Sequence, residues 1–366
     1  MSEPSGPMRR FHAPGRANLI GEHTDHTGGL VLPAAIDRGI TLTARLGGDR
    51  IALDSDAVEE SVDLPADGAA PPVQGWGRFV AAVAAELDAA GRPPMGLQGS
   101  LASDLPRAAG LSSSAALEVV VATALCAAAG YGLDPLELAA LCRRAEHRAV
   151  GVPSGIMDQA VSLLGREDHA LLLDCATLEH RHVPLPADHR LVLIDSGVRR
   201  ELSGSAYAAR TEELAASLGA LGRRRPSQVD PLELDDLLVG LDDVPARRLR
   251  HVVTENARVR AAARALADGD LAHLGELFAA SHASLRDDFE VSTPELDRLV
   301  LLAGQAGARA ARMTGAGFGG SIVALVHERR VGQVVEQVVA GYRAAHPQRR
   351  AVVHRCRAVA GARELG

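Results

Sequence analysis

The sequence contains no lysine, so all 39 of its basic residues are arginine. Several enzyme classes depend on a lysine. The Walker A loop places one on the nucleotide phosphates, protein kinases use one from a strand, and Schiff-base chemistry needs its amine. The sequence therefore excludes these classes. If this chain binds a nucleotide, it must hold the phosphates in another way.

Cysteine pairs and long apolar runs are also absent from the sequence. The four cysteines lie far apart and form no C-x-x-C pair, so they indicate reduced thiols and no cysteine-based metal site. The N-terminal segment has no signal-peptide core, and no apolar run is long enough for a membrane span. With a formal net charge of −7, the chain is not expected to bind nucleic acid. We therefore expect a cytoplasmic protein with no membrane partner.

The order of the expected elements indicates an α+β protein, and 366 residues are enough for two domains. We place these domains at 1–190 and 191–366. Residues 40–54 are expected to form a β-hairpin, and 11–29 a loop or flexible leader. Hydrophobic periodicity predicts helices at 76–90, 112–129, 135–150, 203–219, 246–268, 270–284, 294–305 and 331–345, and strands at 97–102, 169–175, 181–185, 190–195, 308–313, 321–326 and 351–356.

The stretch from Leu105 to Glu118 is rich in small residues and runs into a predicted helix. The first turn of a helix has unpaired backbone N–H groups and the positive end of the helix dipole, so it favours anions. Ser112 is a suitable N-cap, and Ser113 and Ser114 add further hydroxyl groups. The stretch is a candidate phosphate loop, and the alternative is an ordinary capped helix start.

Three further segments, 14–29, 151–159 and 314–320, combine glycines with polar residues. The second of them places Asp158 at a predicted helix start, and the third is a glycine loop between two predicted strands. A glycine loop alone is a common connection between strands. Taken together, the four segments predict one functional site to which each contributes.

The four segments resemble, in the same order, the motifs of the galactokinase family within the GHMP small-molecule kinases. The matching stretches are GRANLIGEHTD at 15–25, GLSSSAALE at 110–118, GIMDQ at 155–159 and MTGAGFGGS at 313–321. The resemblance implies a two-domain fold, with a ribosomal-protein-S5-like N-terminal domain and a ferredoxin-like C-terminal domain. The active site would lie in the cleft between them.

The resemblance also implies a reaction: ATP-dependent phosphorylation of galactose at its anomeric hydroxyl, giving galactose 1-phosphate and ADP. Phosphoryl transfer needs an oriented acceptor hydroxyl and neutralised phosphate charge. Asp158 matches the family's catalytic aspartate, which takes the hydroxyl proton or orients the hydroxyl. Arg16 matches the arginine that pairs with this aspartate and with the transferring phosphate. We expect Arg16 to lower the pKa of Asp158 and to stabilise the transition state.

Further site residues follow from the family motifs, because sugar hydroxyls call for carboxylate and imidazole partners and Mg²⁺ on ATP prefers oxygen ligands. The expected sugar-binding residues are Glu22, His23, Thr24, Asp25, Gly155 and Tyr207. The expected ATP-binding residues are Ala108, Ala109, Gly110, Leu111, Ser112, Ser113, Ser114, Gly315 and Gly317. The family's magnesium ligands match Ser114 and Glu146.

The sequence departs from the family pattern beside the sugar site, where His26 and Thr27 replace the usual Tyr-Asn. This leaves open a kinase for galacturonate, arabinose or an N-acetylhexosamine. A further alternative is a non-catalytic sensor of galactose and ATP. The presence of both Arg16 and Asp158 counts against a sensor, which needs neither. The sequence does not determine the oligomeric state, for which our expectation is a monomer.

Overall fold

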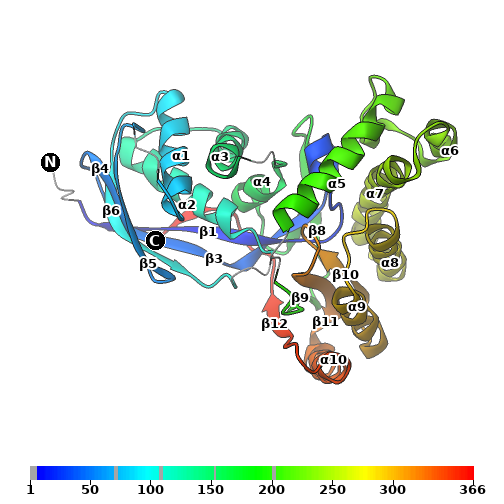
Figure 1. Cartoon of the computed structure of the whole chain (residues 1–366). Helices are drawn as coiled ribbons and strands as arrows, with labels where there is room; N and C mark the ends of the chain where they lie inside the picture. Colours follow the sequence, from blue (N-terminus) through cyan, green and yellow to red (C-terminus); the bar gives the residue numbers. More distant parts are fainter. Residues whose placement is uncertain (1–5, 70–72, 107–109, 152–153, 200–202) are drawn as a thin grey trace.

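The computed structural model describes residues 6–69, 73–106, 110–151, 154–199 and 203–366. Its architecture is α+β, as the order of the predicted elements indicated, with helices packed on β-sheets (Figure 1). No helix in these ranges is long and apolar enough to cross a membrane. All four cysteines are free thiols.

The largest sheet has six strands in the order β13-β1-β3-β6-β4-β5. Helices α1 to α4 lie together on one face of this sheet (Figure 1). The strands are β1 Met8–Asn18, β3 Pro33–Leu46, β4 Arg50–Ser55, β5 Val58–Pro65, β6 Leu97–Ser103 and β13 Arg363–Leu365. The helices are α1 Gly77–Ala89, α2 Ser113–Ala129, α3 Pro135–Val150 and α4 Met157–Leu164.

Local sequence explains two of these helices. Residues 115–122 of α2 are buried without a break, because all but Glu118 are apolar and the helix packs against α1, α3, α4 and the sheet. Helix α3 has Pro135 at its first position, and Asp134 forms a capping box with Glu137. These residues satisfy N–H groups that a helix start otherwise leaves unpaired.

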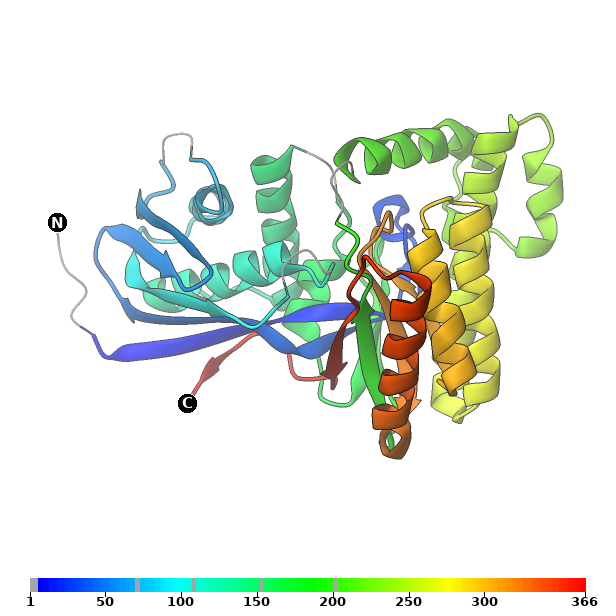
Figure 2. The same cartoon turned by 60° about the horizontal axis from the view of Figure 1, so that its bottom comes forward.

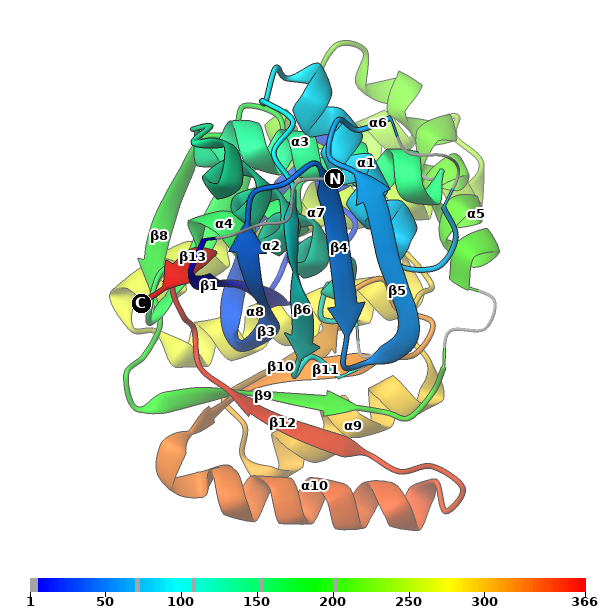
Figure 3. The same ribbon diagram turned by 90° about the vertical axis from the view of Figure 1, so that its left-hand side faces the viewer.

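A second sheet has four antiparallel strands in the order β10-β11-β9-β12. Helices α9 and α10 cover one of its faces (Figure 3). Along the chain, β9, a helical segment, β10, β11, α10 and β12 give the β-α-β-β-α-β order of a ferredoxin-like fold, as the resemblance implied. The bounds are β9 His189–Asp195, β10 Ala310–Thr314, β11 Ser321–His327, β12 Val352–Cys356, α9 Pro294–Ala306 and α10 Val331–Ala345.

The remaining elements are a small sheet in the order β2-β7-β8 and a group of helices at the end of the molecule away from β4 and β5 (Figure 2). Their bounds are β2 Leu30–Val31, β7 His169–Asp174, β8 His180–Pro184, α5 Ser203–Leu218, α6 Leu234–Leu238, α7 Asp243–Asp268 and α8 Leu271–Asp287. Short 3-10 helices lie at Asp25–Thr27, Gly219–Leu221, Pro226–Gln228, Pro231–Glu233 and Glu328–Arg330.

The largest hydrophobic cluster contains residues from both halves of the chain, and a second cluster lies entirely within the second half, between Val192 and Tyr342. Val259 of α7 and Phe278 of α8 belong to the same buried cluster as Phe11 of β1 and Val120 of α2. Strand β13 also pairs with β1, so the end of the described chain lies in the first sheet. The division into domains at residue 190 stays a prediction.

Two predicted elements are wrong. Residues 40–54 form two strands, β3 and β4, but not a hairpin, because β6 lies between them and pairs with both. Residues 11–18 belong to strand β1 and not to a loop. Pro14 misled the prediction, and the structure accommodates it at a β-bulge, where the register with β3 shifts. The other predicted helices and strands are present within a few residues.

Candidate active site

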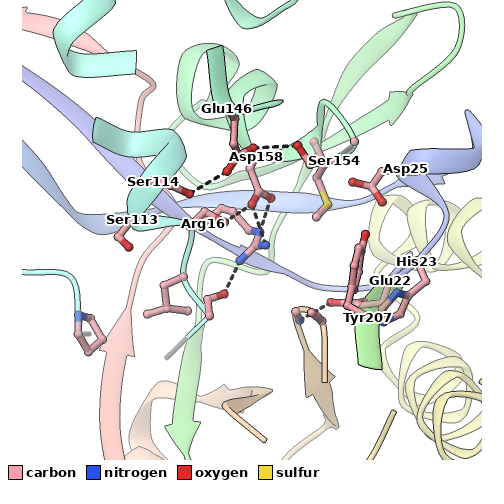
Figure 4. A pocket seen from close by; sticks show the side chains of 18 residues that line it. Arg16, Glu22, His23, Asp25, Ser113, Ser114, Glu146, Ser154, Asp158 and Tyr207 are labelled. Atoms are coloured by element: carbon pink, nitrogen blue, oxygen red, sulfur yellow. Dashed lines mark hydrogen bonds and ion pairs between the residues drawn. The ribbon is translucent and has the colours of Figure 1, made fainter. Parts of the chain in front are cut away.

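The four segments predicted to form a site meet in one cavity of about 360 Å³ (Figure 4). The predicted site residues that line it are Arg16, Glu22, His23, Asp25, Gly110, Leu111, Ser112, Ser113, Ser114, Glu146, Gly155, Asp158, Tyr207 and Gly315. Lining residues to which the sequence gave no role are Pro106, Ser154, Met157 and Ala316.

A bidentate ion pair joins Arg16 of β1 to Asp158 in the first turn of α4 (Figure 4). Arg16 Nε lies 2.8 Å from Asp158 Oδ1, and Arg16 Nη2 lies 3.0 Å from Asp158 Oδ2. The planar guanidinium matches the two carboxylate oxygens, so the pair fixes the orientation of both groups. The structure thus contains the predicted pairing of these two residues.

Gly15 allows β1 to carry Arg16 against the phosphate loop. A Cβ atom on Gly15 would lie 2.5 Å from Leu105 Cδ2 and 2.6 Å from the carbonyl oxygen of Leu111, so only glycine fits. The Arg16 amide donates a hydrogen bond of 3.3 Å to that Leu111 oxygen. Arg16 Nη1 also donates to the carbonyl oxygen of Gly110. The arginine therefore holds the phosphate loop as well as Asp158.

Burial raises the pKa of Asp158 above its usual value, and this effect exceeds the lowering by Arg16 and by the Ser112 hydroxyl. The negative charges of Glu146 and Asp25 add to the rise. The charge of Arg16 thus lowers the pKa of Asp158 as expected, but the effect of burial is larger. The Asp158 side chain keeps 28% of its surface exposed, which leaves room for a substrate hydroxyl.

Ser112 does not cap α2 in the predicted way. Its backbone is left-handed, with φ of 60°, and its side chain makes no capping hydrogen bond. Its hydroxyl instead donates to Asp158 Oδ2. A left-handed conformation is unfavourable for a residue other than glycine. The strained loop thus gives the Asp158 carboxylate a donor in addition to Arg16.

Glu146 of α3 accepts hydrogen bonds from three side chains, and two of the donors, Ser114 and Ser154, are drawn in Figure 4. Ser114 Oγ donates to its Oε1 at 2.9 Å, and Ser154 Oγ and Gln159 Nε2 each donate to its Oε2 at 2.9 Å. The two predicted magnesium ligands, Ser114 and Glu146, are therefore in contact. Within the described ranges, no three His, Cys, Asp or Glu side chains are placed to hold a metal ion. A cation bound here would need phosphate and water oxygens as well.

A second carboxyl group, Glu118 of α2, is fully buried behind Glu146. Gln159 Nε2 bridges the two groups, since it also donates to Glu118 Oε2 at 3.1 Å. Burial and the charge of Glu146 raise the pKa of Glu118 to about 9. Glu118 is therefore protonated at neutral pH, and it adds no second negative charge beside Glu146.

Asp25 lies at the start of a 3-10 helix and faces Gly155. A Cβ atom on Gly155 would lie 1.9 Å from Asp25 Oδ2, so this close approach requires glycine. Burial acts to raise the pKa of Asp25, but the interaction with His26, whose Nδ1 lies 3.5 Å from Asp25 Oδ1, contributes to a net lowering of that pKa. Asp25 is thus an ionised acceptor at the cavity wall.

His23 and Tyr207 form an aromatic wall of the cavity, with ring centroids 5.8 Å apart. The His23 ring also packs on Phe289, at 4.5 Å between centroids. Burial lowers the pKa of His23 well below its usual value, so the ring is neutral. In the part of the chain that the structure describes, the buried Nε2 of His23 has no hydrogen-bond partner. A neutral imidazole has one nitrogen that can accept a hydrogen bond, and among the described residues Nε2 is the one without a partner.

Glu22 lines the cavity, but its carboxylate is already bound by protein groups. Its Oε1 accepts from the Gly315 amide at 3.0 Å and from Thr314 Oγ1 at 3.2 Å, and its Oε2 pairs with Arg312. Burial raises the pKa of Glu22 even though Arg312 acts to lower it. Glu22 therefore connects its own loop to the glycine loop at 314–320.

Four predicted binding residues are not placed on the cavity wall. The hydroxyl of Thr24 donates to two backbone carbonyls of its own loop, so it shapes the loop. Gly317 packs against Val291, where a Cβ atom would lie 2.4 Å from the carbonyl oxygen. Ala108 and Ala109 lie outside the described residues.

A second hollow of about 370 Å³ adjoins the cavity and shares Ser113 and Ser114 with it. Its other walls are mostly apolar and include the rings of Trp76 and Phe79. Sequence reasoning missed this hollow because both rings fit the apolar pattern of an ordinary helix. An apolar pocket with aromatic walls beside a phosphate loop has the character of a site for a flat ring.

Family models match three stretches of the chain. They are the GHMP kinases N terminal domain at residues 78–166, the GHMP kinases C terminal model at 262–344, and the galactokinase galactose-binding signature at 3–46. A crystal structure of Lactococcus lactis galactokinase complexed with galactose is 35% identical, with a TM-score of 0.92, over 98% of this chain and 95% of that one. The chain belongs to the galactokinase family. It is an ATP-dependent sugar kinase, and its function is that of a galactokinase.

More distant kinases share only the fold. Mevalonate kinase of Methanococcus jannaschii is 19% identical, with a TM-score of 0.65, over 98% of this chain and 100% of that one. Homoserine kinase of Cytophaga hutchinsonii is 17% identical, with a TM-score of 0.63, over 100% of this chain and 99% of that one. The galactokinase signature matched in this chain covers the loop that carries Glu22, His23 and Asp25.

Proposed function

We propose that this galactokinase phosphorylates galactose at the anomeric hydroxyl, with Asp158 and Arg16 as its catalytic residues. Asp158 accepts or orients the hydroxyl proton, and its raised pKa favours acceptance. Arg16 holds both carboxylate oxygens and contributes the positive charge that the transferring phosphoryl group needs. The bidentate pair in the cavity is the observation that carries this proposal.

Asp25, His23, Glu22 and Tyr207 are the proposed sugar-binding side chains. Asp25 is an ionised acceptor that can take hydrogen bonds from two hydroxyls, and His23 offers an unpaired ring nitrogen. Tyr207 keeps its phenolic proton, because burial raises its pKa, and it serves as a donor. Gly155 leaves the space in which Asp25 and the sugar meet.

The phosphate loop from Gly110 to Ser114 is the proposed site for the ATP phosphates, with Gly315 on the opposite wall. No lysine is present to bind them. Backbone N–H groups at the start of α2, serine hydroxyls and Arg16 take that role instead. We place the adenine ring in the apolar hollow with Trp76 and Phe79, which continues from the phosphate loop.

Ser114 and Glu146 are the proposed protein ligands of Mg²⁺, because a hydroxyl and a carboxylate are oxygen donors that this ion accepts. When bound, the ion would neutralise phosphate charge. Glu146→Gln is expected to raise the Mg²⁺ concentration needed for half-maximal activity by about tenfold or more. Direct Mg²⁺ titration of the nucleotide complex by calorimetry gives a second measure of the same loss. The cytoplasmic location and monomeric state expected from the sequence remain part of this proposal.

An ADP-release assay over galactose, galacturonate, arabinose and N-acetylgalactosamine tests the substrate. We expect turnover to be highest with galactose, and Asp158→Asn to lower kcat by about 100-fold or more. Asp268→Asn, an exposed change on α7, is the matched control. Galactose binding without turnover in the unmodified protein would support the sensor alternative. Full kcat in Asp158→Asn would exclude the catalytic role of Asp158.

A further inference from the structure

The sugar loop, residues 19–30 from the end of β1 to the first residue of β2, is anchored by side chains from the C-terminal half of the chain. Glu255 Oε1 on α7 accepts a hydrogen bond of 2.9 Å from the Gly21 amide. Asn256, the next residue on the same helix, accepts one of 2.7 Å from the Leu30 amide. The two ends of the loop are therefore fixed to one helix more than 200 residues away along the chain.

Arg312 of β10 reaches the same loop from another side. Its side chain is fully buried, with 0% of its surface exposed. Its Nη1 pairs with Glu22 Oε2 and also donates to the carbonyl oxygen of Leu19 at 3.0 Å. Its Nη2 lies 3.8 Å from Glu255 Oε1. Arg312 thus joins the loop to α7 through charge.

The anchoring groups form a cluster of two buried acids, Glu22 and Glu255, and two arginines. The fourth member, Arg258, lies 2.7 Å from Glu255 Oε2. Burial acts to raise the pKa of Glu255, but the charges of Arg258 and Arg312 bring it down to about 2. Each charge here has an opposite partner, and removing one leaves its partner buried and unpaired. The positions of the members therefore depend on one another.

Neither Arg312 nor Glu255 lines the cavity, so neither contacts the substrates there. Their effect on the cavity passes through Glu22 and the loop backbone. Glu22 is followed directly by His23, and Asp25 lies two residues further on, so the position of Glu22 determines where these side chains point. A displacement of about 1 Å in a positioning group is enough to weaken a site strongly.

We propose that Arg312 and Glu255 are positioning residues for sugar binding, which hold Glu22 and the sugar loop in place without contacting the sugar. This inference rests on the proposed sugar site. If it is correct, side chains of α7 and β10 increase the affinity for the sugar although they lie outside the sugar site. Among the described residues of the phosphate loop, none is bonded to Arg312 or Glu255, so we expect the effect to fall on the sugar more than on ATP.

Arg312→Lys is the first test, because lysine keeps the charge but cannot bond Glu22 and Leu19 with the same geometry. We expect the galactose Kd, measured by calorimetry on the folded protein, to rise about tenfold, which corresponds to about 1.4 kcal/mol. The KM for galactose should rise in parallel, with a smaller change in the KM for ATP. Arg309→Lys, the same change at an exposed position just before β10, is the control.

Glu255→Gln is the second variant, because it keeps nearly the same shape and an acceptor oxygen for the Gly21 amide. It should weaken galactose binding less than Arg312→Lys does. A lower unfolding temperature with unchanged galactose Kd in both variants would show that the cluster is only structural, and would overturn the inference.

Glu22→Gln separates failure of this inference from failure of the sugar site. Unchanged galactose binding in Glu22→Gln would refute the proposed sugar role of Glu22, and the inference with it. Weaker binding in Glu22→Gln, combined with unchanged binding in Arg312→Lys and Glu255→Gln, would refute the positioning roles alone.

Discussion

The catalytic pair and the sugar loop share a cavity but differ in what holds them. Arg16 and Ser112 both bond to Asp158, and all three residues lie in the first half of the chain. The sugar loop is bonded to α7 and β10, which lie in the second half. The cavity is thus completed only where the two halves of the chain meet.

This difference indicates that phosphoryl transfer and sugar binding can be altered separately. Changes around Asp158 should lower kcat while leaving galactose affinity nearly intact. Changes around the sugar loop, including distant ones in α7, should raise the galactose Kd with less effect on the chemical step. Measuring both KM and Kd for each variant separates an effect on sugar binding from an effect on the chemical step.

The largest expected effect comes from Arg16→Gln, which removes the positive charge beside Asp158. We expect kcat to fall about 1,000-fold, because arginines that stabilise phosphoryl transfer contribute on this scale. Galactose Kd should change little, as measured by calorimetry beside the ADP-release assay. Arg10→Gln, an exposed change in the same strand, serves as control. An equal loss of sugar affinity in Arg16→Gln would contradict the proposed separation.

Gly155→Ala tests the sugar loop in place of the catalytic pair. The added Cβ would lie 1.9 Å from Asp25 Oδ2, so Asp25 must move away from its place in the sugar site. We expect the galactose KM to rise about tenfold or more, consistent with lost positioning of a binding group. The control is Gly304→Ala in α9, where an added Cβ meets nothing within 4 Å. A fall in kcat alone, with KM unchanged, would count against the prediction.

Glu118→Gln tests the support behind Glu146. The pKa of Glu118 is about 9 in the folded chain and near 4.5 when unfolded, so folding takes up a proton between these values. The contribution of Glu118 to the free energy of unfolding is therefore complete below about pH 4.5. It falls by up to about 1.4 kcal/mol per pH unit as the pH rises toward 9. An amide does not titrate. The unfolding temperatures of both proteins are measured at pH 5, 7 and 9. As the pH rises, the unfolding temperature of Glu118→Gln should increase relative to that of the original protein.

A parallel pH dependence in both proteins would exclude this titration. The exposed change Glu336→Gln on α10 should follow the original protein throughout.

The smallest effect is expected from His26→Phe. His26 lies 3.5 Å from Asp25 and helps to keep the pKa of Asp25 low, so its removal should let Asp25 take up a proton at higher pH. At pH 5, the galactose Kd of His26→Phe should exceed that of the original protein, by less than about tenfold. The Kd values of the two proteins should converge near pH 8. The measurement is calorimetry across this pH range. Identical pH profiles would show that His26 does not influence the ionisation of Asp25.

The elements that the sequence predicted well have strong local signals. Helix α3, for example, starts with Asp134 and Pro135, and its bounds follow from those residues. The hairpin at 40–54 failed because strand order depends on β6, which enters the sheet some 50 residues later along the chain. The turn residues Pro14 and Gly15 concealed β1, which is a strand because it pairs along its length with β3.

The site, too, has a part that the sequence predicted and a part that it did not. The motifs predicted the Arg16–Asp158 pair and the contact of Ser114 with Glu146, because each motif carries its own functional side chain. The anchors of the sugar loop were not predictable from any motif. Glu255 lies in an ordinary helical stretch with no motif around it, and Arg312 precedes its motif by one residue. Only the fold brings them to the loop.

The bonds that build this cavity also link substrate binding to folding. Arg16 and Asp158 are 142 residues apart in the sequence, and Glu22 and Gly315 are 293 residues apart. A partly folded chain has neither contact, so galactose and ATP bind only the native state. By mass action, a substrate at 100 times its Kd stabilises that state by about 2.7 kcal/mol. In a cell supplied with galactose, the enzyme would therefore unfold less often and be degraded more slowly than in a cell without it.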